Sequence, residues 1–382
     1  MLTKGDISAA DIICLELLIE EGIFVQRIMH QHNTYPHTSS ILALTVIPFL
    51  ALIEHDSIPY LEKKFGFSLP KENADLIRIR HKTKSIDSRY LNYQKYREEA
   101  ARIIEASRRR FREKGIARLL PPSFVKDIGI SYFEGMPIYS TFSVANVLDD
   151  ENGSLWSNSK ECCSSVGYNA GSACAFHYCL AEEVIKDKRF FLSNEFTVTA
   201  NDHIYSSLVK KSISRKTNDE YVFFFLSEQL LRLSSIQALR KSGFLEKTIW
   251  LKLATVYLFH AYKAIGSFIG VTHKPPQKFI YSQILLSECS GIFSRDEKKQ
   301  IRRMKKLRNA FVHYDFEDLI STTMSNSRNF DLLLEAAINS TMKMDFFQYE
   351  FFLSNVVDKA IMNLKAIIGF PEYDPKCNIF AD

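Results

Sequence analysis

One decapeptide decides how this chain is interpreted: Lys305-Lys306-Leu307-Arg308-Asn309-Ala310-Phe311-Val312-His313-Tyr314. It places an arginine, an amide and a histidine together at the end of a basic segment with a helical pattern. Upstream, Ser294-Arg295-Asp296-Glu297 has the Ser-x-x-Glu form of a capping box, which predicts that a helix begins there. Apolar residues then recur every three or four positions and predict one buried stripe. The stripe consists of Ile301, Met304, Leu307 and Phe311.

The polar residues of this helix fall on different faces. Asn309 and His313 are four positions apart and therefore share a face. Arg308 and His313 are five apart, so they diverge by roughly 140° on a straight helix. They can act together only if the helix ends near His313, if the arginine bends around, or if a second copy supplies the partner group. The basic residues off the stripe, which we expect to face solvent, are Arg302, Arg303, Lys305 and Lys306.

Length and composition set broad limits. At 382 residues the chain can hold one large domain or two to three ordinary ones. Its 46% apolar and 24% charged composition is typical of soluble globular proteins. The longest apolar run, Ile41 to Ile53, contains Pro48 and is too short to span a bilayer. No signal-peptide pattern is seen, and seven cysteines favour reduced thiols, so we expect a cytoplasmic protein without membrane contact.

The net charge of +5 is unevenly distributed. Lys95–Arg118 holds nine basic and four acidic residues, and Arg295–Arg308 holds eight basic and two acidic residues. The rest of the chain is therefore net acidic. Two localised basic segments favour contact with a polyanion. The alternative is a pair of solvated helix faces.

Hydrophobic periodicity predicts a mainly α protein. We expect a C-terminal antiparallel helical bundle, residues 215–382, after a mostly helical accessory region, residues 1–214, with a few short strands or irregular segments. A subdivision of the accessory region near 121–160 is left open. Short strands or irregular loops are expected over Ile128–Leu148 and a strand pair over Arg189–Ala200. Helices are expected over Ile7–Met29, Ser39–Glu54, Leu91–Leu120, Gly167–Ile185, Asp219–Lys241, Leu245–Ile269, Gln277–Ile292 and onward from Ser294, with two segments in Phe330–Ile368.

Other candidate sites carry weaker signals. A second Arg-x4-His spacing joins Arg27 to His32, but Ile28 follows the arginine and we expect a coincidence. Walker, Rossmann and Gly-x-Ser-x-Gly patterns are absent, which argues against a nucleotide-driven motor or a serine hydrolase. A cysteine-rich cluster has zinc-like spacing at one end only, so buried thiols are the favoured interpretation. The cluster consists of Cys162, Cys163, Cys174, His177 and Cys179.

The segment Leu307–His313 resembles the HEPN family (higher eukaryotes and prokaryotes nucleotide-binding domains). That family's signature is an arginine, usually followed by a polar residue, and a histidine four to six positions on, in a late helix of an α bundle. The resemblance covers about residues 219–370. One variant continues His-x-Tyr, whereas here Tyr314 follows His313 directly and Asp315 holds the tyrosine position. The resemblance implies a homodimer with two motifs facing one cleft, and often a metal-independent endoribonuclease.

The chemistry of these residues suits that activity. RNA carries its own nucleophile, the 2′-OH, and an imidazole such as His313 can remove that proton or protonate the leaving 5′-oxygen. Arg308 can stabilise charge on the phosphate, and Asn309 can orient His313 or a phosphate oxygen. The candidate RNA-binding residues are Arg302, Arg303, Lys305, Lys306 and Tyr314.

We therefore expect an endoribonuclease that needs no metal or cofactor, and by resemblance a toxin or phage-defence effector with an antitoxin or regulatory partner. Two other readings stay open. In the first, the basic helix belongs to a non-catalytic module that binds nucleotide, RNA or protein. In the second, the chain is a helical scaffold, Arg308 caps carbonyls or pairs with Asp315 or Glu317, and His313 is a satisfied helix-end histidine.

Overall fold

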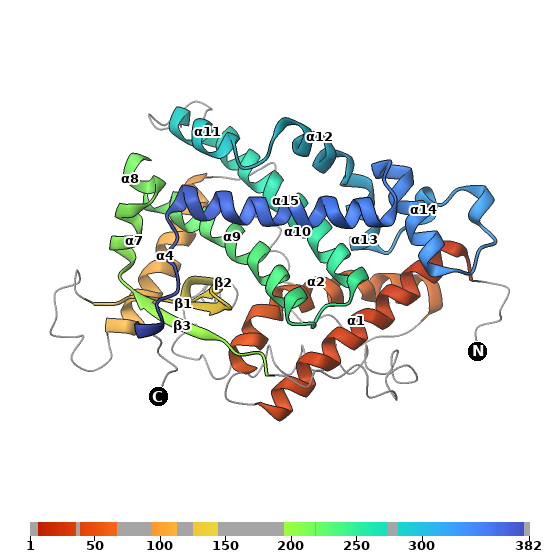
Figure 1. Ribbon diagram of the computed structural model, residues 1–382, viewed down its shortest axis with the longest axis horizontal. Coiled ribbons are helices and arrows are strands. Elements are labelled where there is room, and N and C mark those ends of the chain that lie inside the picture. The colour runs from red at the N-terminus through yellow and green to blue at the C-terminus, as the bar shows by residue number, and fades with distance from the viewer. Residues whose placement is uncertain are drawn as a thin grey trace.

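The computed structural model describes residues 7–35, 39–66, 93–112, 125–143, 195–217, 219–272 and 282–377. These ranges are mainly helical with one small sheet, which confirms the mainly α fold (Figure 1). Within them, every helix is too short or too polar to cross a membrane. The helix expected over Gly167–Ile185 and the cysteine-rich cluster lie outside the described residues.

The N-terminal helices follow the predicted apolar segments. They are α1 (Ala9–Thr34), α2 (Ser39–Phe65) and α4 (Tyr93–Arg112). A Ser8–Asp11 capping box begins α1, with the Ser8 amide donating to the Asp11 carboxylate at 2.9 Å. Helix α2 runs on past the predicted end at Glu54 and contains both Pro48 and Pro59. This extension places polar residues of α2 beside the decapeptide.

A three-stranded antiparallel sheet lies between the N-terminal helices and the bundle. Its strands are β1 (Ile128–Phe133), β2 (Met136–Ser140) and β3 (Thr199–His203), in the order β2-β1-β3. Glu134 and Gly135 join β1 to β2 with φ of 49° and 75°, the conformation that two-residue hairpins favour. The short strands expected over Ile128–Leu148 are thus present, whereas the described end of Arg189–Ala200 contributes only the start of β3.

The C-terminal half is built around two buried antiparallel helices. They are α9 (Glu220–Lys241) and α10 (Lys247–Thr272), both apolar on most faces, as expected for central helices. The long α15 (Phe346–Ile368) crosses the bundle beside them (Figure 1). The shorter helices are α7 (Tyr205–Lys211), α8 (Ile213–Thr217), α11 (Ser282–Ser290), α12 (Arg295–Arg303), α13 (Lys305–His313) and α14 (Phe330–Met342).

One hydrophobic core runs through all of these elements. It includes Leu17 of α1, Phe49 of α2, Ile130 of β1 and Trp250 of α10, each at most 1% exposed. Helix α1 packs against α10 and α14, and α2 packs against α13. The predicted boundary after residue 214 falls inside α8, and the described parts of both predicted regions share this core.

Candidate functional site

The decapeptide lies at the end of a divided helix. The predicted capping box is present, with the Ser294 amide donating to the Glu297 carboxylate at 2.6 Å. All four residues of the predicted stripe are fully buried. The helix is not continuous, because Met304 separates α12 from α13 and its N–H is shared between the carbonyls of Gln300 and Ile301 at 3.2 Å. The predicted basic residues are therefore distributed over two short helices, α12 and α13.

Tyr314 ends α13 in the left-handed conformation, with φ of 49°. Its hydroxyl donates to the Glu21 carboxylate of α1 at 2.5 Å and accepts from Lys252 Nζ of α10 at 2.8 Å. Lys252 also donates to Glu21 at 2.5 Å. The tyrosine is only 3% exposed and its hydroxyl is engaged within the protein, and its predicted contact with RNA stays a prediction. This buried triad fixes the end of α13 to two other helices.

Burial governs the protonation of the buried triad. It raises the pKa of Glu21, while the Lys252 ammonium and the hydrogen bonds from Lys252 and Tyr314 oppose that rise. Burial also raises the pKa of Tyr314 well above its ordinary value, and the nearby Glu21 adds to this effect. The phenol therefore remains protonated and keeps its role as a hydrogen-bond donor.

Arg308 and His313 point to different neighbours. One Arg308 nitrogen donates to Nε2 of His260 on α10, and another donates to the Asn309 side chain at 3.1 Å. His260 is 3% exposed, so Arg308 is held against the bundle, while Asn309 and His313 are exposed. The structure brings Arg308 and Asn309 together on α13 and holds Arg308 against α10.

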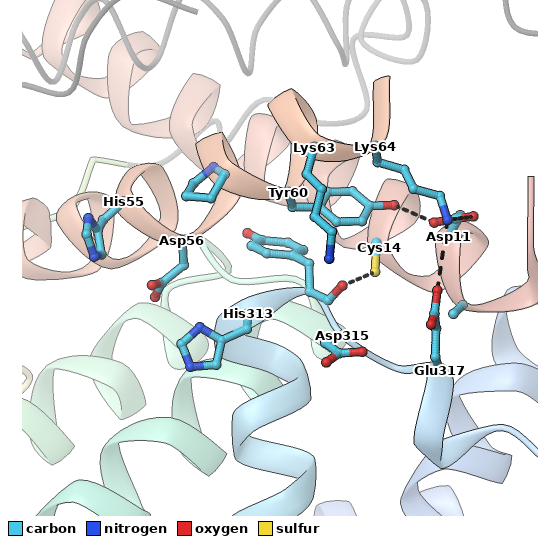
Figure 2. A pocket seen from close by; sticks show the side chains of 13 residues that line it. Asp11, Cys14, His55, Asp56, Tyr60, Lys63, Lys64, His313, Asp315 and Glu317 are labelled. Atoms are coloured by element: carbon cyan, nitrogen blue, oxygen red, sulfur yellow. Dashed lines mark hydrogen bonds and ion pairs between the residues drawn. The ribbon is translucent and has the colours of Figure 1, made fainter. Parts of the chain in front are cut away.

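His313 opens into a cavity of about 480 Å³ between α1, α2 and the end of α13. We call this cavity the His313 pocket (Figure 2). Its lining is mostly polar and includes a second histidine. The lining residues are Ala10, Asp11, Cys14, His55, Asp56, Pro59, Tyr60, Lys63, Lys64, His313, Tyr314, Asp315 and Glu317.

The charged groups of the pocket have distinct environments. Figure 2 shows the Asp56 carboxylate directed toward the side where the His313 ring lies, and the Lys63 amino group extending into the pocket. Lys64 instead binds Asp11 at 3.0 Å. Among the described residues Lys63 makes no ion pair. Of the two lysines in this pocket, Lys63 is therefore the one that can bind an anion entering it.

The neighbouring acidic and thiol groups are already engaged. Burial would raise the pKa of Asp11, but hydrogen bonds from Ser8, Lys64 and Tyr60 hold that pKa below its ordinary value. Burial raises the pKa of Cys14 to about 12, and its Sγ donates to the Tyr314 carbonyl at 3.2 Å. A neutral, buried thiol is a poor nucleophile, so Cys14 serves packing rather than chemistry.

Sequence reasoning missed three residues of the pocket, His55, Asp56 and Lys63. They follow Glu54, the position at which the sequence predicted that this helix ends, and lie in the part of α2 beyond it. One signal was present: His55, Pro59 and Lys63 are spaced by four and share one helix face. The face becomes relevant only when α2 is known to pack against α13.

The predicted basic residues are exposed along α12 and α13. Arg302 donates to the Tyr262 hydroxyl at 2.7 Å and Arg303 to Gln300 at 3.4 Å. Lys305 and Lys306 begin α13 and are exposed. We call these four residues the basic strip, and it presents positive charge on the surface before and at the start of the decapeptide.

The second Arg-x4-His copy has a structural explanation. Arg27 of α1 is 6% exposed, donates to the carbonyls of Gly243 and Phe244 at 2.9 and 3.2 Å, and forms an ion pair with Glu246. It thereby ties α1 to the turn between α9 and α10. His32 is exposed near the end of the same helix.

In the described ranges, no cluster of three or more His, Cys, Asp or Glu side chains is placed to hold a metal ion. Comparison with known proteins returned no matching family model, curated protein or solved structure. The case for a function therefore depends on the geometry of the site.

Proposed function

We propose that this protein is a metal-independent endoribonuclease that cleaves RNA in the His313 pocket. The observation that carries the proposal is that two histidines and a lysine, His313, His55 and Lys63, line one cavity. They come from two helices that pack against each other, so the fold itself assembles the set. The basic strip lies on α12 and α13, the two consecutive helices that lead to His313, and supplies attraction for a phosphate backbone.

Each group has a role in cleavage by the 2′-OH. His313, with Asp56 directed toward it, removes the 2′-OH proton as the general base. The 2′-oxygen then bonds to phosphorus while the bond to the 5′-oxygen breaks, and protonated His55 delivers a proton to that oxygen. Lys63 stabilises the negative charge that grows on the phosphate oxygens. The products are a 2′,3′-cyclic phosphate and a 5′-OH.

Arg308 and Asn309 take supporting roles in this proposal. Arg308 anchors α13 to α10 through His260, which positions His313 without contact with the scissile phosphate. Asn309 lies one turn before His313 on the same face and is placed to contact the RNA strand.

The decisive experiment is cleavage of bulk RNA in the presence of EDTA. Wild type, His313→Ala, His55→Ala and the matched control His32→Ala are compared, and RNA ends are analysed for cyclic phosphate. We expect cleavage by wild type and the control, and a loss of about 100-fold or more in both pocket variants. If His313→Ala and His55→Ala cleaved RNA as fast as wild type, with unchanged melting temperatures, the mechanism would be refuted.

A second candidate function is a non-catalytic module that binds RNA, nucleotide or protein. The carboxylates of the pocket, which outnumber its two lysines, favour this alternative. In that case wild type binds RNA through the basic strip but leaves it intact, and His313→Ala does not alter affinity. RNA affinity measured on the same samples therefore separates the two functions.

The cellular setting is also a proposal. Cys14 and Cys289 are buried free thiols, which supports a reducing compartment such as the cytoplasm. An endoribonuclease of this kind would serve as a toxin or phage-defence effector and would need an antitoxin or other regulator. That role is tested by measuring cell growth when the protein is expressed alone and when it is expressed together with the product of a neighbouring gene.

A further inference from the structure

The His313 pocket contains more acidic groups than a phosphate site requires. Its lining includes four carboxylates and two lysines, although a carboxylate repels the phosphate that the proposed reaction brings in. Each carboxylate therefore needs a role of its own. The four are Asp11, Asp56, Asp315 and Glu317.

Three of these carboxylates have neighbours that account for them. Asp11 belongs to the capping box of α1 and binds Lys64 at 3.0 Å. Asp56 is directed toward the side of the pocket where the His313 ring lies (Figure 2). The Glu317 side chain is 72% exposed and lies 3.9 Å from Lys64. The fourth carboxylate has no such neighbour in the part of the chain that the structure describes.

Asp315 is this fourth carboxylate, and its position is fixed through the backbone. It follows the left-handed Tyr314, and its N–H donates to the Ala310 carbonyl at 3.1 Å. Because the buried triad holds Tyr314, His313 and Asp315 leave the chain on either side of an immobilised residue. The Asp315 carboxylate makes no hydrogen bond or ion pair with another described residue. Both of its oxygens are therefore available to a ligand in the pocket.

We propose that Asp315 binds the Watson–Crick edge of a guanine base, so that the protein cleaves single-stranded RNA after guanosine. This inference rests on the proposed function and names its substrate. Guanine presents two parallel donors, N1–H and N2–H, which match the two acceptor oxygens of one carboxylate. Adenine and cytosine each offer one amino group beside a ring nitrogen that only accepts, and uracil offers one N–H between two carbonyls. Guanine is thus the base that satisfies both oxygens.

The order of groups along the pocket places the guanosine on the 5′ side of the cut. Figure 2 shows His55 toward one end of the pocket and Asp315 toward the other, with His313 between them. In the proposed reaction, His313 contacts the attacking 2′-OH and His55 contacts the leaving 5′-oxygen. The nucleotide that carries the 2′-OH therefore lies on the Asp315 side. The cavity of about 480 Å³ is within the range of about 300–1,000 Å³ that is usual for small-molecule sites.

This contact also restricts the substrate to unpaired RNA. The Watson–Crick edge of a guanine in a duplex is already bonded to cytosine, so it has no donors left for the Asp315 carboxylate. Bases in single strands and loops can be turned out and recognised by this edge. We therefore expect cleavage after guanosines in single strands and hairpin loops, and protection of guanosines in stems.

The first test is nucleotide binding, which does not depend on cleavage. Isothermal titration calorimetry compares guanosine 3′-monophosphate with the 3′-monophosphates of inosine, adenosine, cytidine and uridine. We expect the guanosine nucleotide to bind about tenfold to 100-fold more tightly than those of adenosine, cytidine and uridine. Inosine lacks the N2 amine, so its nucleotide should bind about tenfold more weakly than that of guanosine. The inosine comparison uses wild type alone and does not depend on how a variant folds.

Substitution of Asp315 shows whether this carboxylate reads the base. Asp315→Asn replaces one acceptor oxygen by a donor that faces the donors of guanine, so the preference for the guanosine nucleotide should be lost. The matched control is Asp318→Asn, which removes the same charge at an exposed position outside the pocket lining. The control should keep the preference. Melting temperatures verify that both variants are folded.

The second test is the position of the cut in RNA hairpins that carry one guanosine, either in the loop or in the stem. Wild type and Asp318→Asn should cut after the loop guanosine and leave guanosine 2′,3′-cyclic phosphate, whereas the stem guanosine should be spared. Asp315→Asn should cut without this preference.

The two tests separate the inference from the proposed function. Preferential binding of the guanosine nucleotide without any cleavage of RNA would support the base contact and contradict the ribonuclease. Cleavage without a base preference, or a guanosine preference that persists in Asp315→Asn, would overturn the inference and leave the ribonuclease standing. A protein that neither binds these nucleotides nor cuts RNA would contradict both.

Discussion

At the residue scale, the buried triad of Glu21, Lys252 and Tyr314 shows how the decapeptide is held. Lys252 and Glu21 are each at most 1% exposed, so both charges have lost their water. Such charges are tolerated only when the ion pair and its hydrogen bonds are complete. The left-handed Tyr314 supplies the third member. The triad therefore depends on all three helices that contribute to it.

Removal of one member should destabilise the protein strongly. Lys252→Met leaves the Glu21 carboxyl buried without its cation, and we expect a loss of about 3–5 kcal/mol in the free energy of unfolding. Tyr314→Phe removes hydrogen bonds only, with an expected loss of about 1–3 kcal/mol. Urea denaturation measures both, with the exposed Lys299→Met as control. If Lys252→Met left the free energy of unfolding unchanged, the buried triad would not be what holds these helices together.

The two lysines of the pocket should differ in their effect on cleavage. Lys63→Gln removes the ammonium that extends into the cavity, so kcat should fall by about tenfold to 100-fold. Lys64→Gln removes a group that is bound to Asp11, so stability should change more than kcat. Steady-state kinetics on a short RNA substrate would reveal this difference. If Lys64→Gln lost more kcat than Lys63→Gln, the assigned role of Lys63 would be wrong.

Glu20 of α1 gives the stability a dependence on pH. Burial raises its pKa to about 8 from an ordinary value of 4.5, and nearby carboxylates add to the rise against a hydrogen bond from Thr248. Because the folded pKa is the higher one, its contribution to stability is complete below pH 4.5 and is lost as pH rises through 8. Glu20→Gln should therefore melt higher than wild type at alkaline pH and approach it in acid. Thermal melts across pH test this, and parallel curves for the two proteins would contradict it.

At the element scale, local patterns identified most helices and missed their interruptions. The stripe from Ile301 to Phe311 and the Ser294 cap were readable because both are short-range signals. The break at Met304 was not readable, since Met304 itself belongs to the stripe and is a good helix former. The length of α2 was underestimated because the prediction followed the apolar stretch to Glu54, whereas the helix continues through Pro59 to Phe65.

The start of α12 offers a measurable test at this scale. Ser294→Ala removes the side chain that accepts from the Glu297 amide, and helix caps contribute about 1 kcal/mol. Glu297 also binds Lys359 of α15 at 2.8 Å, so fraying of α12 should loosen that contact. The unfolding free energy should fall by about 1 kcal/mol, and Ser287→Ala in α11 serves as the control. Equal stability of the two variants would show that the cap contributes nothing.

At the scale of the whole molecule, the sequence predicted two regions divided after residue 214. In the structure, the described residues of both regions contribute to one hydrophobic core. Periodicity reports which face of a helix is buried but not which distant helix covers it. The pairing of α2 with α13 was therefore beyond a single sequence, and so were His55, Asp56 and Lys63 as neighbours of His313. The exposed basic strip was predictable because its charge is concentrated in one short segment. Arg308 and Asn309 were identified as a pair, but the contact with His260 was not.

The basic strip should control the salt dependence of RNA binding. Replacement of Arg302, Arg303, Lys305 and Lys306 by glutamine removes up to four phosphate contacts. The slope of log affinity against log salt should become shallower by about 3, since each contact to single-stranded RNA contributes about 0.7. Fluorescence anisotropy at several salt concentrations measures this slope. Arg109→Gln on α4 is the control, and a comparable loss there would place the RNA surface on α4 instead.

The buried triad also has a consequence for how the protein is made. Glu21 and Tyr314 are 293 positions apart, and His55 is likewise translated long before His313. A ribosome therefore releases the α1 and α2 side of the pocket long before the segment that carries His313. Under the proposed function, RNA cleavage would begin only after the segment that carries His313 has emerged and packed against α1 and α2.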